Sequence, residues 1–254
     1  MHEDEKNIPT SYRSLKTIFL GEYGIPFQGA SMVLMDVPLD RREVKKILPL
    51  GFWPTNPPMA TLFVADYPKF PYGEPYREAL MMVHVRTLLG RGIHCNWILV
   101  DNDAGLIGGR DFLGYPKKIG ELTFAETDGT IRASVTRRGT RLMSVEARRS
   151  EPEDNPGPVF RHKNFNLGGP GQMVTMNPIL LFYPREVIHE SFKAQTKLIL
   201  NDSVFDPIAR LVVGDPVSAR IVRMDILLPP KYIFPVGYTG GWRWFLNTFN
   251  MRFR

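Results

Sequence analysis

Two adjacent lysines, Lys117 and Lys118, are the residues whose type and spacing best suit catalysis. A solvated lysine stays protonated near neutral pH, and its amine is a nucleophile only without that proton. Burial in an apolar pocket or a nearby second cation lowers the pKa of a lysine, and the free amine can then form an imine with a carbonyl. An exposed turn is the alternative interpretation, because Gly-Tyr-Pro before two lysines also suits a turn.

The segment Gly109 to Lys118 reads GRDFLGYPKK and resembles the active-site segment of the acetoacetate decarboxylase family. The family pattern begins Gly-Arg-Glu and ends Pro-Lys-Lys, and its first lysine forms the imine. The resemblance implies that Lys117 is the nucleophile, that Lys118 and Tyr115 support it, and that Arg110 contacts the substrate. In acetoacetate decarboxylase itself, a neighbouring cation is a recognised cause of the lysine's reactivity.

A second stretch, Tyr76 to Val83, is similar to the family's Tyr-x-Glu strand, which carries a catalytic glutamate. The resemblance implies that Glu78 acts as acid or base and that Tyr76 orients the substrate. Decarboxylases of the family also carry an early arginine and a second glutamate. An ungapped comparison places Gln28 and Phe63 at those positions, and we expect both residues to contact the substrate.

Without that arginine and glutamate, the resemblance implies an imine-forming lyase of the aldolase or dehydratase type, acting on a 2-oxo acid such as pyruvate. A decarboxylase of a 3-oxo acid and a catalytically silent small-molecule binding protein are the alternatives. Release of carbon dioxide from acetoacetate would separate the first two, and failure to trap any adduct with borohydride would favour the third. In each case the partner is a small-molecule oxo acid, and we expect no cofactor.

Strands dominate the elements that must position these residues. Apolar runs predict strands at 31–37, 60–67, 78–89, 96–101, 122–127, 130–136, 141–148, 173–183, 186–200 and 217–228. Asp128-Gly129 predicts a hairpin turn. The pattern indicates an α+β fold that is predominantly antiparallel β, with sheets closed or packed into a barrel-like body, as the resemblance also implies. On an extended segment only one of the two lysines can point into a given cavity, because alternate side chains face opposite ways.

Few helices are expected. Asp40, followed by Glu43 three residues later, fits a capping box at the start of a short helix. Asp206-Pro207 predicts a second helix start. Residues 105–109 are typical of a turn, and the proline- and glycine-rich residues 152–171 are typical of a long connection.

The carboxyl-terminal run, residues 242–254, is unusually aromatic and basic. Packing against the protein body or a neighbouring subunit is the favoured interpretation, because aromatic residues, methionine and arginine are enriched at interfaces. An amphipathic segment docked on a membrane surface is the alternative. We expect a homo-oligomer.

Composition argues against nucleic acid and membranes as partners. The net charge is +6 over 254 residues, but the basic residues form no long block. No apolar run suits a membrane-spanning helix, and the acidic amino terminus lacks an apolar signal core, so we expect a cytoplasmic protein. Cys95 is typical of a buried apolar residue, and the histidines show no metal-ligand spacing. No flexible linker interrupts the chain, so we expect one domain over residues 1–254.

Overall fold

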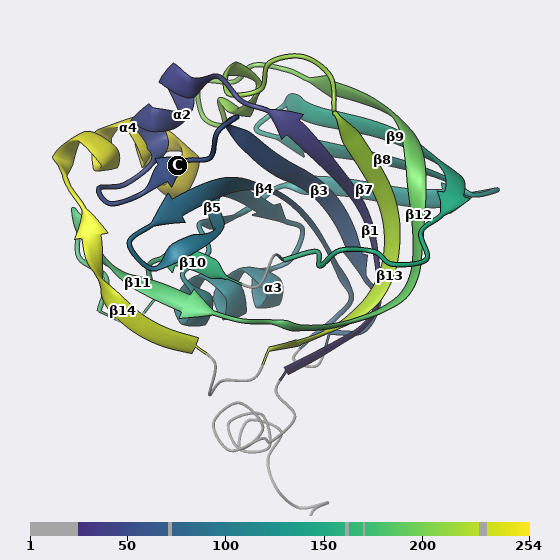
Figure 1. The fold of residues 1–254 in the computed structure, drawn as a ribbon, viewed down its shortest axis with the longest axis horizontal. Coiled ribbons are helices and arrows are strands. Elements are labelled where there is room, and N and C mark those ends of the chain that lie inside the picture. The colour runs from purple at the N-terminus through teal and green to yellow at the C-terminus, as the bar shows by residue number, and fades with distance from the viewer. Residues whose placement is uncertain (1–24, 71–72, 161–162, 170, 229–232) are drawn as a thin grey trace, which may run out of the picture.

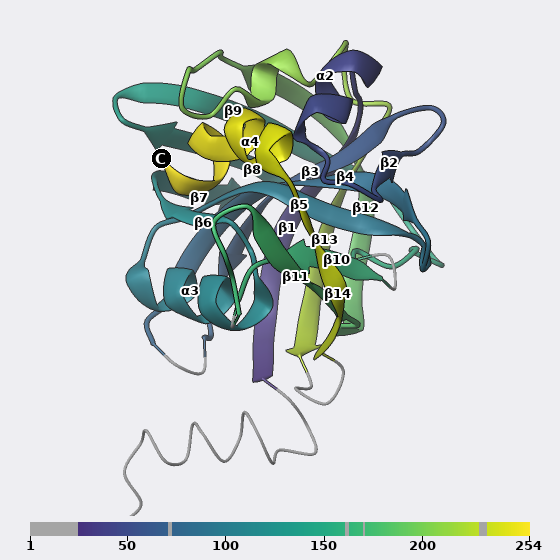
Figure 2. The same cartoon turned by 90° about the vertical axis from the view of Figure 1, so that its left-hand side faces the viewer.

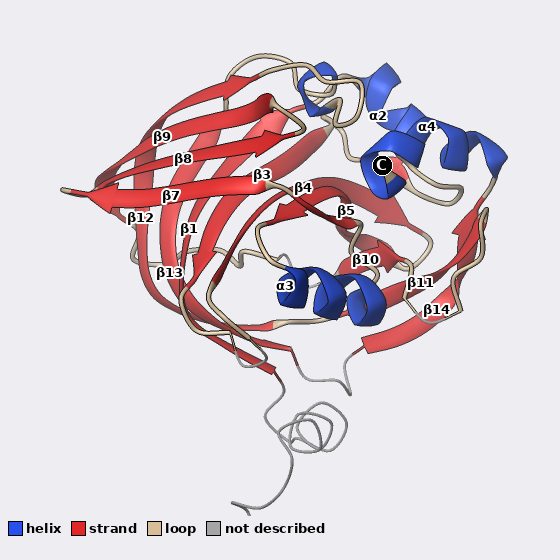
Figure 3. Ribbon diagram, turned by 180° about the vertical axis from the view of Figure 1, so that it is seen from behind, coloured by secondary structure: helices blue, strands red, loops and turns tan. Residues whose placement is uncertain are grey.

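The computed structural model describes residues 25–70, 73–160, 163–169, 171–228 and 233–254, and strands predominate in them (Figures 1 and 3). The strands are β1 (Ile25–Pro38), β2 (Trp53–Pro54), β3 (Met59–Tyr67), β4 (Tyr76–Thr87), β5 (Gly90–Val100), β6 (Lys117–Ile119), β7 (Glu121–Thr127), β8 (Thr130–Arg137), β9 (Thr140–Pro152), β10 (Asn164–Leu167), β11 (Met176–Phe182), β12 (Arg185–Leu200), β13 (Ser218–Leu228) and β14 (Ile233–Gly240). The helices are α2 (Arg41–Ile47), α3 (Asp103–Ile107), the π-helix η2 (Gly108–Phe112), the 3₁₀-helix η3 (Ile208–Arg210) and α4 (Trp242–Phe253).

These fourteen strands form one mixed sheet in the order β14-β11-β10-β5-β4-β3-β1-β13-β12-β9-β8-β7, with β2 paired to β4 and β6 paired to β5. Within the described residues, β5 pairs in parallel with β6 and β10, and the other pairs are antiparallel. The sheet curls around an interior but does not close (Figure 1). The prediction of a mostly antiparallel, barrel-like fold is therefore confirmed in its packed rather than its closed form.

The central strands β3, β4 and β5 are buried on both faces, which explains their nearly continuous apolar sequences. Side chains that alternate along β4 enter two different cores. Ala79 and Met81 join one core, whereas Tyr76 and Leu80 join the other. Because the side-chain period of a strand is two, Glu78 lies on the same face as Tyr76 and Leu80.

The helices lie at the two ends of the curled sheet, with α2 and α4 together at one end and α3 at the other (Figure 2). Helix α2 begins where the sequence predicts, since Asp40 Oδ1 accepts hydrogen bonds from the backbone N–H groups of Arg42 (2.7 Å) and Glu43 (2.9 Å). The Glu43 side chain pairs with Lys46 (2.6 Å) rather than completing the capping box. None of the described helices is long and apolar enough to cross a membrane.

The carboxyl-terminal run forms α4, whose Trp244 and Met251 are buried against the body of the protein. Packing on the protein body, which the sequence favours, is therefore confirmed. Two other predictions are wrong, because residues 105–109 belong to α3 and η2 rather than to a turn, and the connection at 152–171 contains β10. The helix start predicted at Asp206-Pro207 is confirmed only as the three-residue η3. In the last case the Asp206 side chain does not cap the helix, because it contacts other partners.

Candidate active site

Lys117 and Glu78 meet through the register of three strands. Glu78 lies opposite Val100 in the β4–β5 pair, and Lys117 lies opposite Ile98 in the parallel β5–β6 pair. Strand β5 thus brings together two side chains that are 39 positions apart, and Lys117 Nζ donates to Glu78 Oε2 at 2.5 Å. The two side chains are only 6% and 7% exposed, so the pair is shielded from solvent.

The helical segment before β6 makes room for the lysine. A Cβ atom at Gly109 would lie 2.3 Å from Cε of Lys117 and 2.7 Å from its Cδ, so any other residue here would force the lysine side chain to shift. Arg110 Nη1 donates to the backbone oxygen of Lys117 (3.3 Å). At Gly114 the backbone adopts a φ of +67°, and the chain then enters β6.

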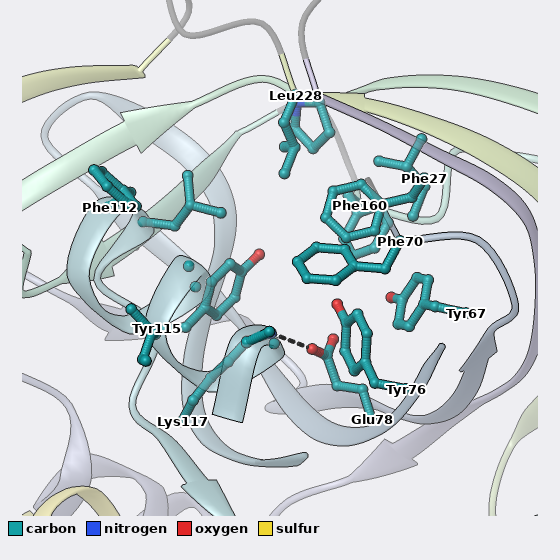
Figure 4. Close-up of a pocket in the computed structure, with 18 of the residues that line it drawn as sticks. Phe27, Tyr67, Phe70, Tyr76, Glu78, Phe112, Tyr115, Lys117, Phe160 and Leu228 are labelled. Carbon is teal, nitrogen blue, oxygen red and sulfur yellow. Dashed lines mark hydrogen bonds and ion pairs between the residues drawn. The ribbon is translucent and has the colours of Figure 1, made fainter. Parts of the chain in front are cut away.

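The pair lies at one end of a cavity of about 490 Å³ (Figure 4). Aromatic and aliphatic side chains make up most of its described wall. The residues that line it are Phe27, Tyr67, Phe70, Tyr76, Glu78, Ala104, Gly105, Ile107, Gly108, Gly109, Phe112, Leu113, Tyr115, Lys117, Phe160, Pro184, Ile226, Leu228 and Ile233. Lys117 is the one cationic side chain in this described wall.

Three tyrosines surround the pair. The Tyr67 and Tyr76 rings stack with centroids 4.8 Å apart, and Lys117 Nζ lies 5.2 Å from the Tyr76 ring centroid and 6.0 Å from that of Tyr115. Burial raises the pKa of all three phenols well above its usual value, and the nearby Glu78 carboxyl raises it further. The hydroxyls therefore keep their protons and can donate hydrogen bonds to a bound oxygen.

Lys118 points away from the cavity, as expected for the neighbour of Lys117 on a strand. Its ammonium donates to Asp206 Oδ1 and to the Asn250 carbonyl oxygen (3.2 Å) in α4. Asp206 also accepts from Trp97 Nε1 (2.9 Å) and Arg137 Nη1 (3.0 Å). Burial lowers the pKa of Lys118 to about 8, against the opposing effect of the Asp206 carboxylate. Lys118 therefore joins β6 to α4 and does not reach a substrate beside Lys117.

The structure brings together Lys117, Glu78, Tyr76 and Tyr115, and their roles stay predictions. It does not bring three other expected residues into the described wall. Gln28 is exposed, whereas its neighbour Phe27 lines the cavity. Phe63 is fully buried in the core behind it, with its ring 5.9 Å from that of Phe160.

The third of these residues, Arg110, contacts the backbone of the lysine rather than the cavity. Sequence reasoning also missed Tyr67, although it ends β3 directly opposite Tyr76. The apolar residues contributed by β13, Ile226 and Leu228, carry no catalytic signal in the sequence. Among the described residues, no three His, Cys, Asp or Glu side chains gather as metal ligands. Cys95 is buried, as expected, and burial raises the pKa of its thiol.

Comparison with known proteins identifies the family of the chain and supports the arrangement of its strands. Residues 8–234 match the family model described as acetoacetate decarboxylase (ADC), so the chain belongs to the acetoacetate decarboxylase family. A search of curated proteins finds no match.

Solved structures share the fold at low sequence identity. Acetoacetate decarboxylase from Legionella pneumophila subsp. pneumophila str. Philadelphia 1 is 18% identical, with a TM-score of 0.75 over 85% of this chain and 88% of that chain. The enduracididine biosynthesis enzyme MppR complexed with pyruvate is 15% identical, with a TM-score of 0.68 over 79% and 86%. An acetoacetate decarboxylase-like enzyme from Sphingomonas wittichii RW1 is 16% identical, with a TM-score of 0.66 over 87% and 92%.

Proposed function

We propose that this protein is an imine-forming lyase that acts on an oxo acid, with Lys117 as the nucleophile and Glu78 as the proton acceptor and donor. The observation that carries the proposal is the buried contact of 2.5 Å between Lys117 Nζ and Glu78 Oε2 at the polar end of an apolar cavity. A carboxylate in that place can take the proton that the amine must lose before it attacks.

The first step forms a carbon–nitrogen bond between Lys117 Nζ and the substrate carbonyl carbon. Glu78 takes one proton from the Lys117 ammonium group before the attack, and the nitrogen releases a second proton as the new bond forms. The carbonyl oxygen takes up both protons and leaves as water, which yields a protonated imine and restores the Glu78 carboxylate. The hydroxyls of Tyr76 and Tyr115 are placed to donate to the departing oxygen, because both keep their protons.

The protonated imine withdraws electrons from the adjacent carbon. With a 2-oxo acid such as pyruvate, the methyl group next to the imine carbon loses a proton and gives an enamine, which can attack an aldehyde and then lose water. The solved MppR structures with pyruvate, and with a condensation product of pyruvate and imidazole 4-carboxaldehyde, support this chemistry as one that the fold accommodates. We propose it as the reaction class here.

Decarboxylation of a 3-oxo acid is a second candidate, and the composition of the cavity favours it. The described wall offers no cation except Lys117 to a substrate carboxylate. An unpaired carboxylate is costly in an apolar site, whereas neutral carbon dioxide is not. The bond to that carboxylate breaks as its electrons pass to the imine, which leaves an enamine that Glu78 can protonate.

Borohydride reduction followed by mass spectrometry tests the proposal. We expect incubation with pyruvate or acetoacetate to give a reduced adduct on Lys117, which disappears in Lys117→Ala and persists at least partly in Lys118→Ala. Release of carbon dioxide from acetoacetate would select decarboxylation. An adduct on Lys118, or no adduct with any oxo acid, would contradict the assignment.

A further inference from the structure

The cavity has a polar end and an apolar end (Figure 4). Lys117, Glu78, Tyr76 and Tyr115 gather at one end, and Phe160 and Leu228 lie toward the other. Phe27 lies on the apolar side, where its ring meets that of Tyr67 with centroids 5.6 Å apart. A chain of ring contacts joins the two ends, with centroids 5.1 Å apart for Tyr76 and Phe70 and 5.5 Å apart for Phe70 and Phe27. The apolar wall is therefore continuous from the amine outward.

The cavity is large for a short oxo acid. A volume of 490 Å³ corresponds to the liquid volume of roughly sixteen water molecules. Pyruvate alone is small, with about six non-hydrogen atoms, and it leaves more than half of that room to a second substrate or to water against apolar side chains. Pockets of this size usually hold considerably larger ligands.

Charge complementarity points in the same direction. Away from the Lys117–Glu78 pair, the described wall contains no ionisable side chain except the tyrosines, whose raised pKa values keep them neutral. A charged group at the far end would find no ionic partner among the described residues of the wall, and desolvation without a partner is strongly unfavourable. An apolar group there would instead gain free energy with each methylene that it buries.

We infer that the carbonyl substrate carries a neutral apolar group, about the size of a hexyl chain, that lies in this wall and extends from the imine carbon toward Phe27 and Leu228. The inference rests on the proposed function, because it assumes that the carbonyl sits at Lys117. Any acid group of the substrate then lies beside the reacting carbonyl and not at the far end.

A homologous series of methyl ketones tests the size of the apolar group. We expect borohydride trapping on Lys117 to become about two- to fourfold more efficient per added methylene from acetone to 2-octanone, after correction for the reactivity of each ketone with a free lysine derivative. A comparison of 2-octanone with 7-oxooctanoate tests charge, because the two ketones differ only in that a carboxylate takes the place of the terminal methyl group. We expect at least tenfold less adduct with 7-oxooctanoate. Equal trapping within either comparison would overturn the inference.

Two glycine variants test the location of the apolar group. Gly108 lines the cavity, has a helical φ of −57° and has open space where a Cβ atom would lie, so Gly108→Leu should occupy part of the cavity. We expect the ratio of 2-octanone adduct to acetone adduct to fall at least tenfold. Gly157→Leu is the matched control, because Gly157 is exposed, has equal room and does not line the cavity. A ratio that is unchanged in Gly108→Leu would refute the proposed location.

Calorimetry separates this inference from the proposed function. We expect 2-octanol, which cannot form an imine, to bind at least tenfold more tightly than 7-hydroxyoctanoate. If no ketone gives an adduct but 2-octanol binds in this way, the imine chemistry is refuted and the apolar binding site stands. If adducts form but neither chain length nor charge matters, the imine chemistry stands and the apolar site is refuted.

Discussion

Substituting Gly109 with alanine should uncouple the lysine from its carboxylate. The added Cβ would lie 2.3 Å from Lys117 Cε, whereas real contacts of this kind begin near 3.0 Å and are ordinary from 3.4 Å. The Cε atom must therefore move by about 0.7 to 1.1 Å, the differences between those limits and 2.3 Å. A shift of that size carries Nζ away from Glu78 Oε2 and lengthens the 2.5 Å contact toward the limit of a hydrogen bond.

A misplacement of about 1 Å in a catalytic group costs on the order of 100-fold in rate, or about 2.7 kcal/mol of transition-state stabilisation. We expect Gly109→Ala to slow the trapping of a ketone on Lys117 by about that factor. The assay is the rate of adduct formation by mass spectrometry, with the unfolding midpoint measured alongside because overpacking also lowers stability.

Gly108→Ala is the matched control for this experiment. Gly108 is the preceding residue of the same segment, has helical backbone angles, and has no other part of the chain within 4 Å of the place where a Cβ atom would lie. With acetone, which is too small to reach a side chain at position 108, its alanine variant should therefore react at close to the wild-type rate. If Gly109→Ala also reacted at that rate, the lysine would not need the space above Gly109, and its reactivity would not depend on its close contact with Glu78.

Two further predictions concern the ionisable groups. Glu78→Gln preserves the size of the side chain but removes the proton acceptor, so imine trapping should slow about 100-fold without loss of the folded state in thermal unfolding; a wild-type rate would exclude Glu78 as the base. Lys118 has a pKa of about 8 in the folded protein, below its ordinary value of 10.5. Between these two values, Lys118 is protonated to a greater extent in the unfolded chain than in the folded protein, so the free energy of unfolding rises with pH. Between pH 8 and 9.5, the free energy of unfolding in urea should rise by about 2 kcal/mol less in Lys118→Met than in the wild-type protein. An equal rise in both proteins would contradict the pKa shift.

The strand content of the fold could be predicted because burial leaves a periodic pattern in the sequence. The Asp128-Gly129 hairpin is a good example, since both residues adopt the positive φ angles (48° and 71°) that this pair favours. The helical segment before β6 could not be predicted, because Gly105, Gly108 and Gly109 are poor helix formers. Tertiary packing against Lys117 and Tyr76 explains two of these glycines better than any turn does.

Phe27 lines the cavity, whereas Gln28 does not. An ungapped sequence comparison could not have predicted which of the two residues faces inward. The β1–β13 register shifts between Phe27 and Ala30, and Gly29 has a φ of +67° within that irregularity. A bulge of this kind reverses which side chains face inward, because the side-chain period of a strand is two. The sequence does not signal the bulge except through Gly29, so the ungapped comparison selected the neighbour that faces outward.

The two adjacent lysines also explain how such a short strand keeps its register. Strand β6 has three residues, and a slip of one position would exchange Lys117 for Lys118 at the cavity. The contacts of Lys118 with Asp206 and with Asn250 of α4 are available in one register only, because Asp206 is itself held by Trp97 and Arg137. The carboxyl-terminal helix therefore contributes to the site without lining it, since its contact with one lysine fixes the other beside Glu78.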